Sequence, residues 1–341
     1  MERLRFAVIG CGGRGSGVAE MIAAVTNAQL VAVCDVVEQN ARAVGERLGV
    51  PFFTKTEAMY EAVDVDAVFI ATPVEHHFAL AKEAVLKGKH VILEKIMTTT
   101  AQEAYELAEL ARQKKICGAL SYQLRFYDVY RKWWAVGQSL EPTLIISSRH
   151  PGIMPPNYLR PDPWAGVVDF LSHDIDLVYW VAGREPSLVT AIGYRSTVVV
   201  QDTWDTMTIL LDFGSMTGLV YSAMAGGGLP STHAVIGRKG NVRIESDSLS
   251  VHRFVRTNAD RYERQWERLD TEPVKEDTTG LLVQHFSDWV QGIVKDPFPL
   301  STFEDGYKVM LIHDGIAESL KARQTISLEH IHQRIALSQG G

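Results

Sequence analysis

The sequence predicts a chain of two parts: a doubly wound α/β domain over residues 1–122 and an α+β domain over residues 123–341 with an open, mostly antiparallel sheet. In the first part, short β-branched runs alternate with helical patterns, which is typical of a parallel sheet covered by helices on both faces. Between residues 188 and 255, strand candidates follow one another without helices, as in an antiparallel meander. The length of 341 residues, 46% of them apolar, suits about two domains.

The elements of the first part follow from local patterns. Apolar, β-branched runs predict strands at residues 4–9, 29–34, 67–71, 90–93 and 116–121. Helical spacing predicts helices at residues 18–25, 38–48, 76–86 and 101–114. Threonines at 98–100 are candidate caps for the last of these helices.

The second part begins with a helix at 126–136 and a strand at 143–149, followed by a proline-rich loop. Further strands are predicted at 188–196, 203–213, 216–224, 232–237, 241–245 and 249–255, and helices at 281–294 and 304–322. The last helix is a candidate to pack back on the first domain. Because residues 207–213 and 219–224 carry apolar or small side chains on both strand faces, we expect a homodimer or homotetramer through this sheet.

Charge and cysteine content exclude several classes of protein. The 34 basic and 41 acidic residues give a formal net charge of −7, which favours neither nucleic-acid binding nor binding to an anionic membrane. No apolar run reaches the about 20 residues that span a bilayer, and the N-terminus does not resemble a signal peptide. The three cysteines are widely spaced, as expected of thiols in a reducing compartment. We therefore expect a cytoplasmic protein.

A glycine-rich segment follows the first strand. Gly10-Cys11-Gly12-Gly13-Arg14-Gly15 matches G-x-G-x-x-G, and Asp35 ends the next predicted strand. A chance match or a plain tight turn remains the alternative, but a strand, the glycines, a helix and the acidic residue together form the dinucleotide fingerprint. The glycines and Arg14 would approach the pyrophosphate at the helix N-terminus. Asp35 would bind the ribose hydroxyls, and because two valines follow it, NAD is favoured over NADP.

Polar residues follow two further strands at the edge where open α/β sheets bind ligands. Thr72 and Pro73 end the strand at 67–71, and His77 lies at the start of the next helix, predicted at 76–86. Glu94 and Lys95 end the strand at 90–93. These are candidate cofactor contacts, and Lys95 could also polarise a substrate hydroxyl. The alternatives are a solvated helix turn for the histidine and a surface ion pair for Glu94 and Lys95.

The segment 169–180 predicts an amphipathic helix. At helical spacing, Asp169, His173, Asp176 and Trp180 share one face, and apolar residues cover the other. Asp169 and His173 are i,i+4 neighbours and could form a carboxylate–imidazole pair suited to general-base chemistry. A solvated polar stripe and a metal site are the alternatives, and we predict no metal. Asp174 falls on the apolar side, where we expect a basic side chain or a backbone N–H from another segment as its partner.

The segment Ile70-Ala71-Thr72-Pro73, followed by His77, Ala84 and Gly88-Lys89-His90-Val91-Ile92-Leu93-Glu94-Lys95, resembles the glucose–fructose oxidoreductase/inositol dehydrogenase/MocA (Gfo/Idh/MocA) family. Matching features extend from the glycine loop to Arg125-Phe126, through 169–180, and into the helix that begins with Glu304-Asp305-Gly306. The family usually has Glu-Lys-Pro, whereas Ile96 follows Lys95 here. The resemblance implies a Rossmann domain that binds NAD and a second domain that binds a sugar or polyol.

By this resemblance, Lys95, Asp169 and His173 carry the chemistry. We expect oxidation of a secondary hydroxyl with hydride transfer to nicotinamide. His173 would remove the hydroxyl proton, Asp169 would orient the His173 ring, and Lys95 would stabilise the alkoxide. The candidate substrate-binding residues are these three together with Arg125, His150, Tyr158, Trp164 and Asp176. A redox-neutral sugar-modifying enzyme with tightly bound NAD and a non-catalytic NAD-binding regulator are the two alternatives.

Overall fold

A computed structural model describes residues 3–150, 167–195, 204–223, 229–258, 261–272 and 278–338, without the side chains of 167–169. The chain divides into two compact units. Unit 1 comprises Met1–Phe126 and Val274–Met310, and unit 2 comprises Tyr127–Pro273 and Leu311–Gly341. The sequence-based division placed residues 274–310 in the second part. They pack with unit 1 because a short strand and a helix from this segment complete the sheet and the core of that unit.

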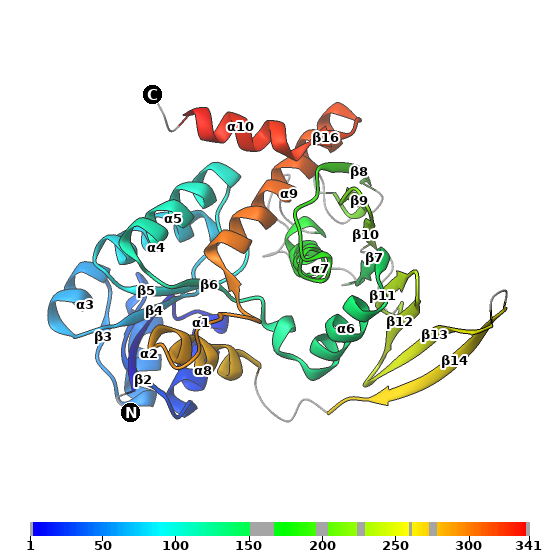
Figure 1. Cartoon of the computed structure of the whole chain (residues 1–341). Coiled ribbons are helices and arrows are strands. Elements are labelled where there is room, and N and C mark those ends of the chain that lie inside the picture. The colour runs from blue at the N-terminus through cyan, green and yellow to red at the C-terminus, as the bar shows by residue number, and fades with distance from the viewer. Residues whose placement is uncertain are drawn as a thin grey trace. The chain divides into compact units, whose positions relative to one another are not determined.

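Unit 1 is built on a seven-stranded sheet with the order β15-β6-β5-β4-β1-β2-β3 (Figure 1). Its strands are β1 (Leu4–Ile9), β2 (Ala28–Cys34), β3 (Phe52–Phe53), β4 (Ala67–Ile70), β5 (His90–Leu93), β6 (Gly118–Leu120) and β15 (Ser301–Thr302). All neighbouring strands are parallel except β15, which pairs antiparallel with β6. This is the predicted doubly wound arrangement, in which the carboxyl ends of the parallel strands meet at one edge of the sheet.

The helices of unit 1 connect these strands. They are α1 (Gly13–Ala24), α2 (Glu38–Leu48), α3 (Thr56–Ala62), α4 (His77–Leu86), α5 (Ala101–Lys114) and α8 (Thr278–Val290), with 3-10 turns η1 (Val74–His76) and η2 (Gln123–Phe126). Helix α9 (Phe303–Ala322) begins in this unit and continues into unit 2. Strand β3 and helix α3 were not predicted, because two or seven residues are too few to show a clear period.

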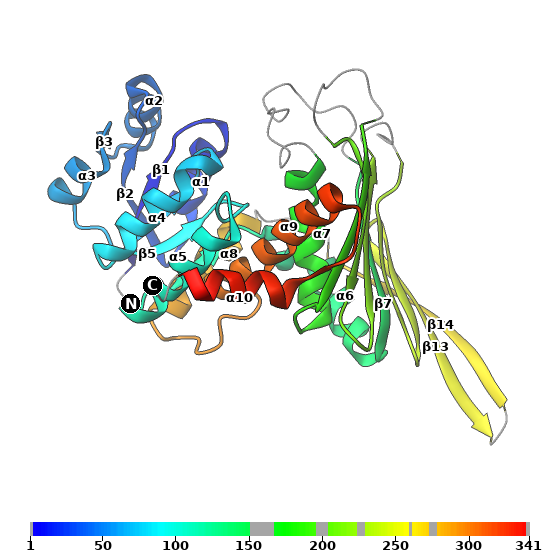
Figure 2. The ribbon, with the colours of Figure 1, turned by 90° about the horizontal axis from the view of Figure 1, so that it is seen from above.

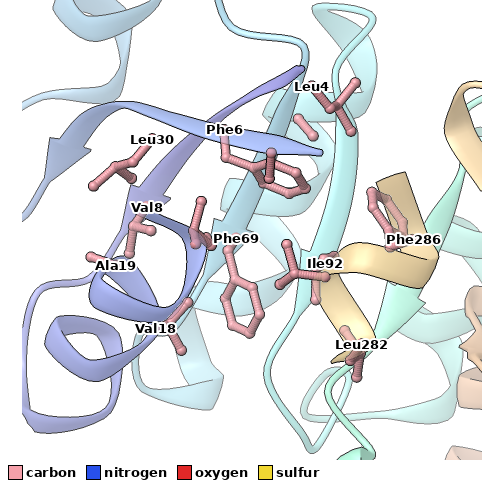
Figure 3. Close-up of a cluster of buried hydrophobic side chains, with 14 of the residues drawn as sticks. Leu4, Phe6, Val8, Val18, Ala19, Leu30, Phe69, Ile92, Leu282 and Phe286 are labelled. Atoms are coloured by element: carbon pink, nitrogen blue, oxygen red, sulfur yellow. The ribbon is translucent and has the colours of Figure 1, made fainter. Parts of the chain in front are cut away.

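The core of unit 1 joins both segments of the chain. Figure 3 shows Phe6 of β1 and Phe69 of β4 in one cluster with Leu282 and Phe286 of α8. The rings of Phe6 and Phe286 lie 6.2 Å apart between their centroids, and both side chains are fully buried. Helix α8 therefore packs against β1, the strand that leads into the glycine loop.

Unit 2 contains a nine-stranded sheet with the order β14-β13-β12-β11-β7-β10-β9-β8-β16. The strands are β7 (Pro142–Ser148), β8 (Leu188–Tyr194), β9 (Thr206–Asp212), β10 (Thr217–Ala223), β11 (Thr232–Gly237), β12 (Gly240–Glu245), β13 (Ser248–Asn258), β14 (Arg261–Asp270) and β16 (Ile326–Ser327). The helices are α6 (Asp128–Ser139), α7 (Val167–Ala182), the later part of α9, and α10 (Leu328–Ser338). In Figure 2, β13 and β14 extend beyond the other strands of this sheet.

The sheet of unit 2 is open and mostly antiparallel, as predicted, but it is not one continuous meander. Strand β7 lies between β10 and β11, parallel to the first and antiparallel to the second. The sequence could not show this because β7 precedes the meander and is separated from it by helix α7. Helix α7 packs on one face of the sheet, where the Val178 side chain lies against the Gly218 backbone of β10. Among the described residues, no helix has the length and apolar character needed to cross a membrane.

Candidate active site

The glycine loop lies between β1 and α1 and brings backbone atoms close together. A side chain at Gly15 would place its Cβ 1.8 Å from the carbonyl oxygen of Gly10, so only glycine allows α1 to approach β1 this closely. Gly10 has a φ of +92° and faces the Ala71 carbonyl. A Cβ added at Gly12 or Gly13, in contrast, would have no atom within 4 Å. The loop is therefore tight on its protein side and open on the other.

Asp35 follows β2 and contacts the glycine loop directly. One of its carboxylate oxygens accepts a hydrogen bond from the Cys11 backbone N–H at 2.6 Å, and the other accepts from the Val37 N–H at 2.8 Å. Val36 and Val37 are exposed, at 88% and 50%. This part of the site therefore presents a carboxylate followed by two apolar side chains.

Arg14 connects the glycine loop to two other strand ends and to α8. Its Nε atom donates to a carboxylate oxygen of Glu94 at 2.6 Å. Its Nη2 atom donates to the Ser121 hydroxyl after β6 at 3.3 Å and to the Thr279 hydroxyl of α8 at 3.1 Å. This contact holds the strand end that carries Glu94 and Lys95 beside the loop. Sequence reasoning did not identify Ser121 and Thr279, since neither lies in a recognisable motif.

His77 has a different role from the cofactor contact expected of it. The side chain is 1% exposed, and its ring nitrogens lie 2.8 Å from the Ile96 carbonyl oxygen and 2.9 Å from the Thr72 carbonyl oxygen. Burial lowers the pKa of its imidazole. Because both nitrogens face backbone carbonyls, His77 lies between the loop after β4 and the turn after Lys95 and has no ring nitrogen left for a cofactor, and as a neutral ring it donates to one of the two oxygens. The Lys95–Ile96 peptide bond is cis.

These features fit a bound dinucleotide. The open space at Gly12 and Gly13 lies at the N-terminus of α1, where the backbone N–H groups of the first turn favour a phosphate. The hydroxyl oxygen of Thr72, at the end of β4, is buried without a hydrogen-bond partner. Gly12, Gly13 and Arg14 would hold the pyrophosphate, and Asp35 would hold the ribose.

Helix α7 leaves fewer of its polar side chains accessible than the predicted amphipathic helix. His173 is half-buried, but Asp176 and Trp180, predicted on the same face, are only 1% and 7% exposed. The Trp180 ring stacks on Trp134 of α6. The side chain of Asp169 lies outside the described residues, so its pairing with His173 stays a prediction.

Asp174 has the kind of partner that the sequence predicted. Its side chain is fully buried, and one carboxylate oxygen accepts hydrogen bonds from Arg149, with N–O distances of 2.9 Å. The other oxygen accepts from the Ser147 hydroxyl at 2.7 Å. Both partners lie at the end of β7, so the basic side chain comes from another segment.

The remaining candidate substrate contacts have different outcomes. Arg125 is 2% exposed and donates to the Leu300 carbonyl oxygen at 3.2 Å, with Asp305 within 3.8 Å. It therefore packs inside unit 1, which corrects its assignment to the substrate. His150 is half-buried, and its ring accepts a hydrogen bond from the Ala223 N–H at 3.3 Å. Tyr158 and Trp164 lie outside the described residues.

The cysteines of unit 1 are not disposed for reactivity or for metal binding. Burial raises the pKa of both the Cys11 and the Cys34 thiol to about 12, so neither forms a thiolate at neutral pH. In the described part of the chain, no three His, Cys, Asp or Glu side chains gather as metal ligands would.

Comparison with known proteins identifies both parts of the chain. The model of the NAD-binding Rossmann fold of the Gfo/Idh/MocA oxidoreductase family matches residues 4–121, and the model of its C-terminal alpha/beta domain matches residues 165–328. The myo-inositol 2-dehydrogenase of Thermotoga maritima is 25% identical over 96% of this chain and 99% of its own. A glycosyl hydrolase family 109 protein of Streptomyces niveus is 34% identical, but over 33% of this chain and 25% of its own.

A solved structure supports the fold. An oxidoreductase from Agrobacterium radiobacter, in complex with NAD+, L-tartaric acid and magnesium, superimposes with a TM-score of 0.84. The match covers 96% of this chain and 99% of the other, at 20% sequence identity.

Proposed function

The chain belongs to the Gfo/Idh/MocA oxidoreductase family, and from this premise we propose that it oxidises a secondary hydroxyl of a sugar or cyclic polyol with NAD. The observation that supports this most directly is the contact from Arg14 to Glu94, which holds the lysine-bearing strand end beside the open glycine loop. Lys95 would thereby stand next to the cofactor site. The full-length similarity to a myo-inositol 2-dehydrogenase supports a polyol as the substrate class.

We propose NAD in preference to NADP. Asp35 would accept hydrogen bonds from the ribose hydroxyls, and its charge would repel a 2′-phosphate. The exposed neighbours Val36 and Val37 offer no cation to offset that repulsion. When bound, the nicotinamide supplies the hydride acceptor.

The side chains of the protein would carry the proton chemistry. His173 would take the proton from the substrate hydroxyl, and Asp169 would stabilise the resulting imidazolium. The Lys95 ammonium would stabilise the negative charge that develops on the oxygen as its proton is removed, and this charge is lost when the hydride leaves the carbon and the carbonyl forms. His150, which is half-buried, is proposed to bind a further hydroxyl of the substrate, whereas Asp176, at 1% exposed, is not proposed as a contact.

Absorbance at the reduced-nicotinamide band tests this proposal. The full chain with NAD is screened against inositols, aldoses, sugar acids and glycosides, and at least one polyol or sugar should reduce NAD. With that substrate, NADP at the same low concentration should support markedly slower turnover. If no sugar or polyol changes the absorbance, net dehydrogenation is rejected.

A redox-neutral reaction is the second candidate, supported by the similarity of a third of the chain to a glycosyl hydrolase family 109 protein. Such an enzyme would retain NAD during purification and convert a glycoside without net change in absorbance. Nucleotide release on denaturation, together with product analysis by mass spectrometry, distinguishes it from the dehydrogenase. A non-catalytic regulator would bind NAD and convert neither a sugar or polyol nor a glycoside.

We also propose that the open sheet forms a homodimer or homotetramer interface. On its outer face, Leu210, Leu219, Ile146 and Ala234 are register neighbours across β9, β10, β7 and β11. Leu210 is 45% exposed and Ile236, on β11, is 41% exposed. A contiguous apolar row of this kind is typical of a subunit interface.

A further inference from the structure

A chain of buried polar side chains lies beneath helix α7 in unit 2. The Tyr130 hydroxyl of α6 lies 3.2 Å from Nε2 of His233, and Nδ1 of His233 lies 2.9 Å from the Ser147 hydroxyl. Ser147 contacts Asp174 at 2.7 Å, and Asp174 pairs with Arg149. His233, Ser147 and Asp174 are each 3% exposed or less. The cluster joins α6, β11, β7 and α7.

The acceptor at the end of this chain determines the direction of every hydrogen bond in it. Asp174 is paired with a guanidinium, so it is ionised and only accepts; the single hydroxyl proton of Ser147 therefore points to it. His233 must then donate from Nδ1 to Ser147, and its Nε2 accepts from Tyr130. His233 is thus a neutral imidazole with its proton on Nδ1. Burial lowers its pKa to about 4, in agreement with this assignment.

This direction excludes a nucleophilic serine, although Ser, His and Asp are the residue types of a hydrolase triad. In such a triad the imidazole accepts the serine proton, whereas here it donates to the serine. Ser147 is also completely buried and has no access to a substrate. The cluster therefore has a structural role in unit 2.

The group that it holds is the backbone of α7. Arg149 donates from Nη2 to the Phe170 carbonyl oxygen at 2.9 Å, and its guanidinium lies 4.4 Å from the Phe170 ring centroid. The same guanidinium is fixed by Asp174, one turn further along the helix. Arg149 therefore binds the helix at the two residues that enclose the segment 170–174, which contains His173.

We propose that Arg149 and Asp174, aligned by the Tyr130–His233–Ser147 chain, are positioning residues that set the placement of His173 for proton abstraction. This inference rests on the proposed function, in which His173 is the base. A small misplacement of a catalytic group can cost about 10²-fold in rate without loss of binding. The cluster should therefore affect turnover more than substrate or cofactor affinity.

The first experiment tests the cluster itself and needs no substrate. In ¹⁵N-histidine-labelled full-length protein at pH 7, the His233 ring should show a protonated Nδ1 and an unprotonated Nε2, with the signal assigned from His233→Gln. Ser147→Ala removes the acceptor and should change this tautomer balance. A proton on Nε2 in the wild-type protein, or an imidazolium at pH 7, overturns the assigned hydrogen-bond direction.

The second experiment tests positioning. Arg149→Gln should lower kcat by about 10- to 100-fold, with the KM for substrate and the affinity for NAD changed less than about twofold. Asp174→Asn should act similarly, and the double variant should be no slower than either single one, since the two residues act as a unit. Arg149→Lys, which keeps the charge, should recover part of the loss. The control Arg268→Gln removes an exposed ion pair with Asp270 and should have no effect.

Hydrogen exchange separates failure of this inference from failure of the proposed function. In Arg149→Gln, exchange should increase more for amides of residues 170–174 than for those near the end of α7, and the control variant should not change. If the wild-type protein oxidises no substrate, the proposed function fails, and exchange still tests the contact between Arg149 and α7. An unchanged kcat in Arg149→Gln, or unchanged exchange at 170–174, overturns the positioning role.

Discussion

Two glycines of the dinucleotide loop should respond in opposite ways to the same substitution. Alanine at Gly12 meets no atom within 4 Å, and the φ of −64° at this residue suits alanine, so the folded unit has no steric reason to change. Its Cβ would instead occupy the space through which a pyrophosphate approaches the backbone. Alanine at Gly15 would place Cβ 1.8 Å from the Gly10 carbonyl oxygen, and relief requires α1 to move away from β1.

The expected magnitudes follow from these contacts. Overpacking against rigid backbone costs about 3 kcal/mol at the upper end of its usual range, so Gly15→Ala should be destabilised by that amount. For a domain of this size, that corresponds to a fall in Tm of roughly 6–12 °C. Loss of one hydrogen bond to a charged phosphate, about 1.5–3 kcal/mol, should weaken NAD binding to Gly12→Ala by roughly 10- to 150-fold.

Calorimetry with and without NAD measures both effects. Saturating NAD should raise the Tm of the wild-type protein by mass action, and this rise should be clearly smaller in Gly12→Ala at the same concentration. Gly17→Ala is the matched control: it lies in α1, also meets no atom within 4 Å, and should bind NAD normally. Wild-type NAD affinity in Gly12→Ala, or wild-type stability in Gly15→Ala, would refute this interpretation of the loop.

Four further outcomes are expected. His173→Ala and Lys95→Ala should each lower kcat by roughly 10²- to 10⁴-fold with NAD binding retained by calorimetry, and unchanged turnover removes that residue from the mechanism. Asp35→Asn should raise the kcat/KM ratio of NADP to NAD, and a constant ratio contradicts its role in selectivity. Because the pKa of His233 is about 4 in the folded chain and about 6.5 when unfolded, stability should be full above about pH 6.5 and fall by roughly 3 kcal/mol towards pH 4. Denaturant titrations of His233→Gln should lack this part of the decline. Leu219→Lys should lower the mass measured by light scattering, whereas a monomeric wild-type protein rejects the sheet interface.

The parts of the site that are built from backbone were largely predictable. The glycine loop, its position after a buried strand and the acidic residue after the next strand all follow from local sequence, because the geometry depends on missing side chains and short spacings. The threonine cap before α5 was visible for the same reason: Thr100 accepts a hydrogen bond from the Glu103 N–H within one turn.

The parts that depend on side chains from distant segments were not predictable in the same way. Helical spacing indicated that Asp174 needs a partner, and it predicted the chemical class, but 25 residues separate Asp174 from Arg149. Helical spacing also placed Asp176 on the same face as His173, although only His173 is appreciably accessible. His77 was placed correctly at the start of a helix, but periodicity carries no information on which ring nitrogen meets which carbonyl.

The two arginine–carboxylate pairs show why stability alone does not explain this arrangement. Arg14 and Glu94 are 38% and 12% exposed, and a pair in such surroundings contributes little to stability, so its consequence lies in where it holds the loop. The Arg149–Asp174 pair is buried, and removing one partner should cost about 3–5 kcal/mol. Replacing both partners with neutral residues avoids the unpaired charge and is often close to neutral for stability. A double variant that remains folded but turns over slowly therefore separates positioning of His173 from stabilisation of unit 2.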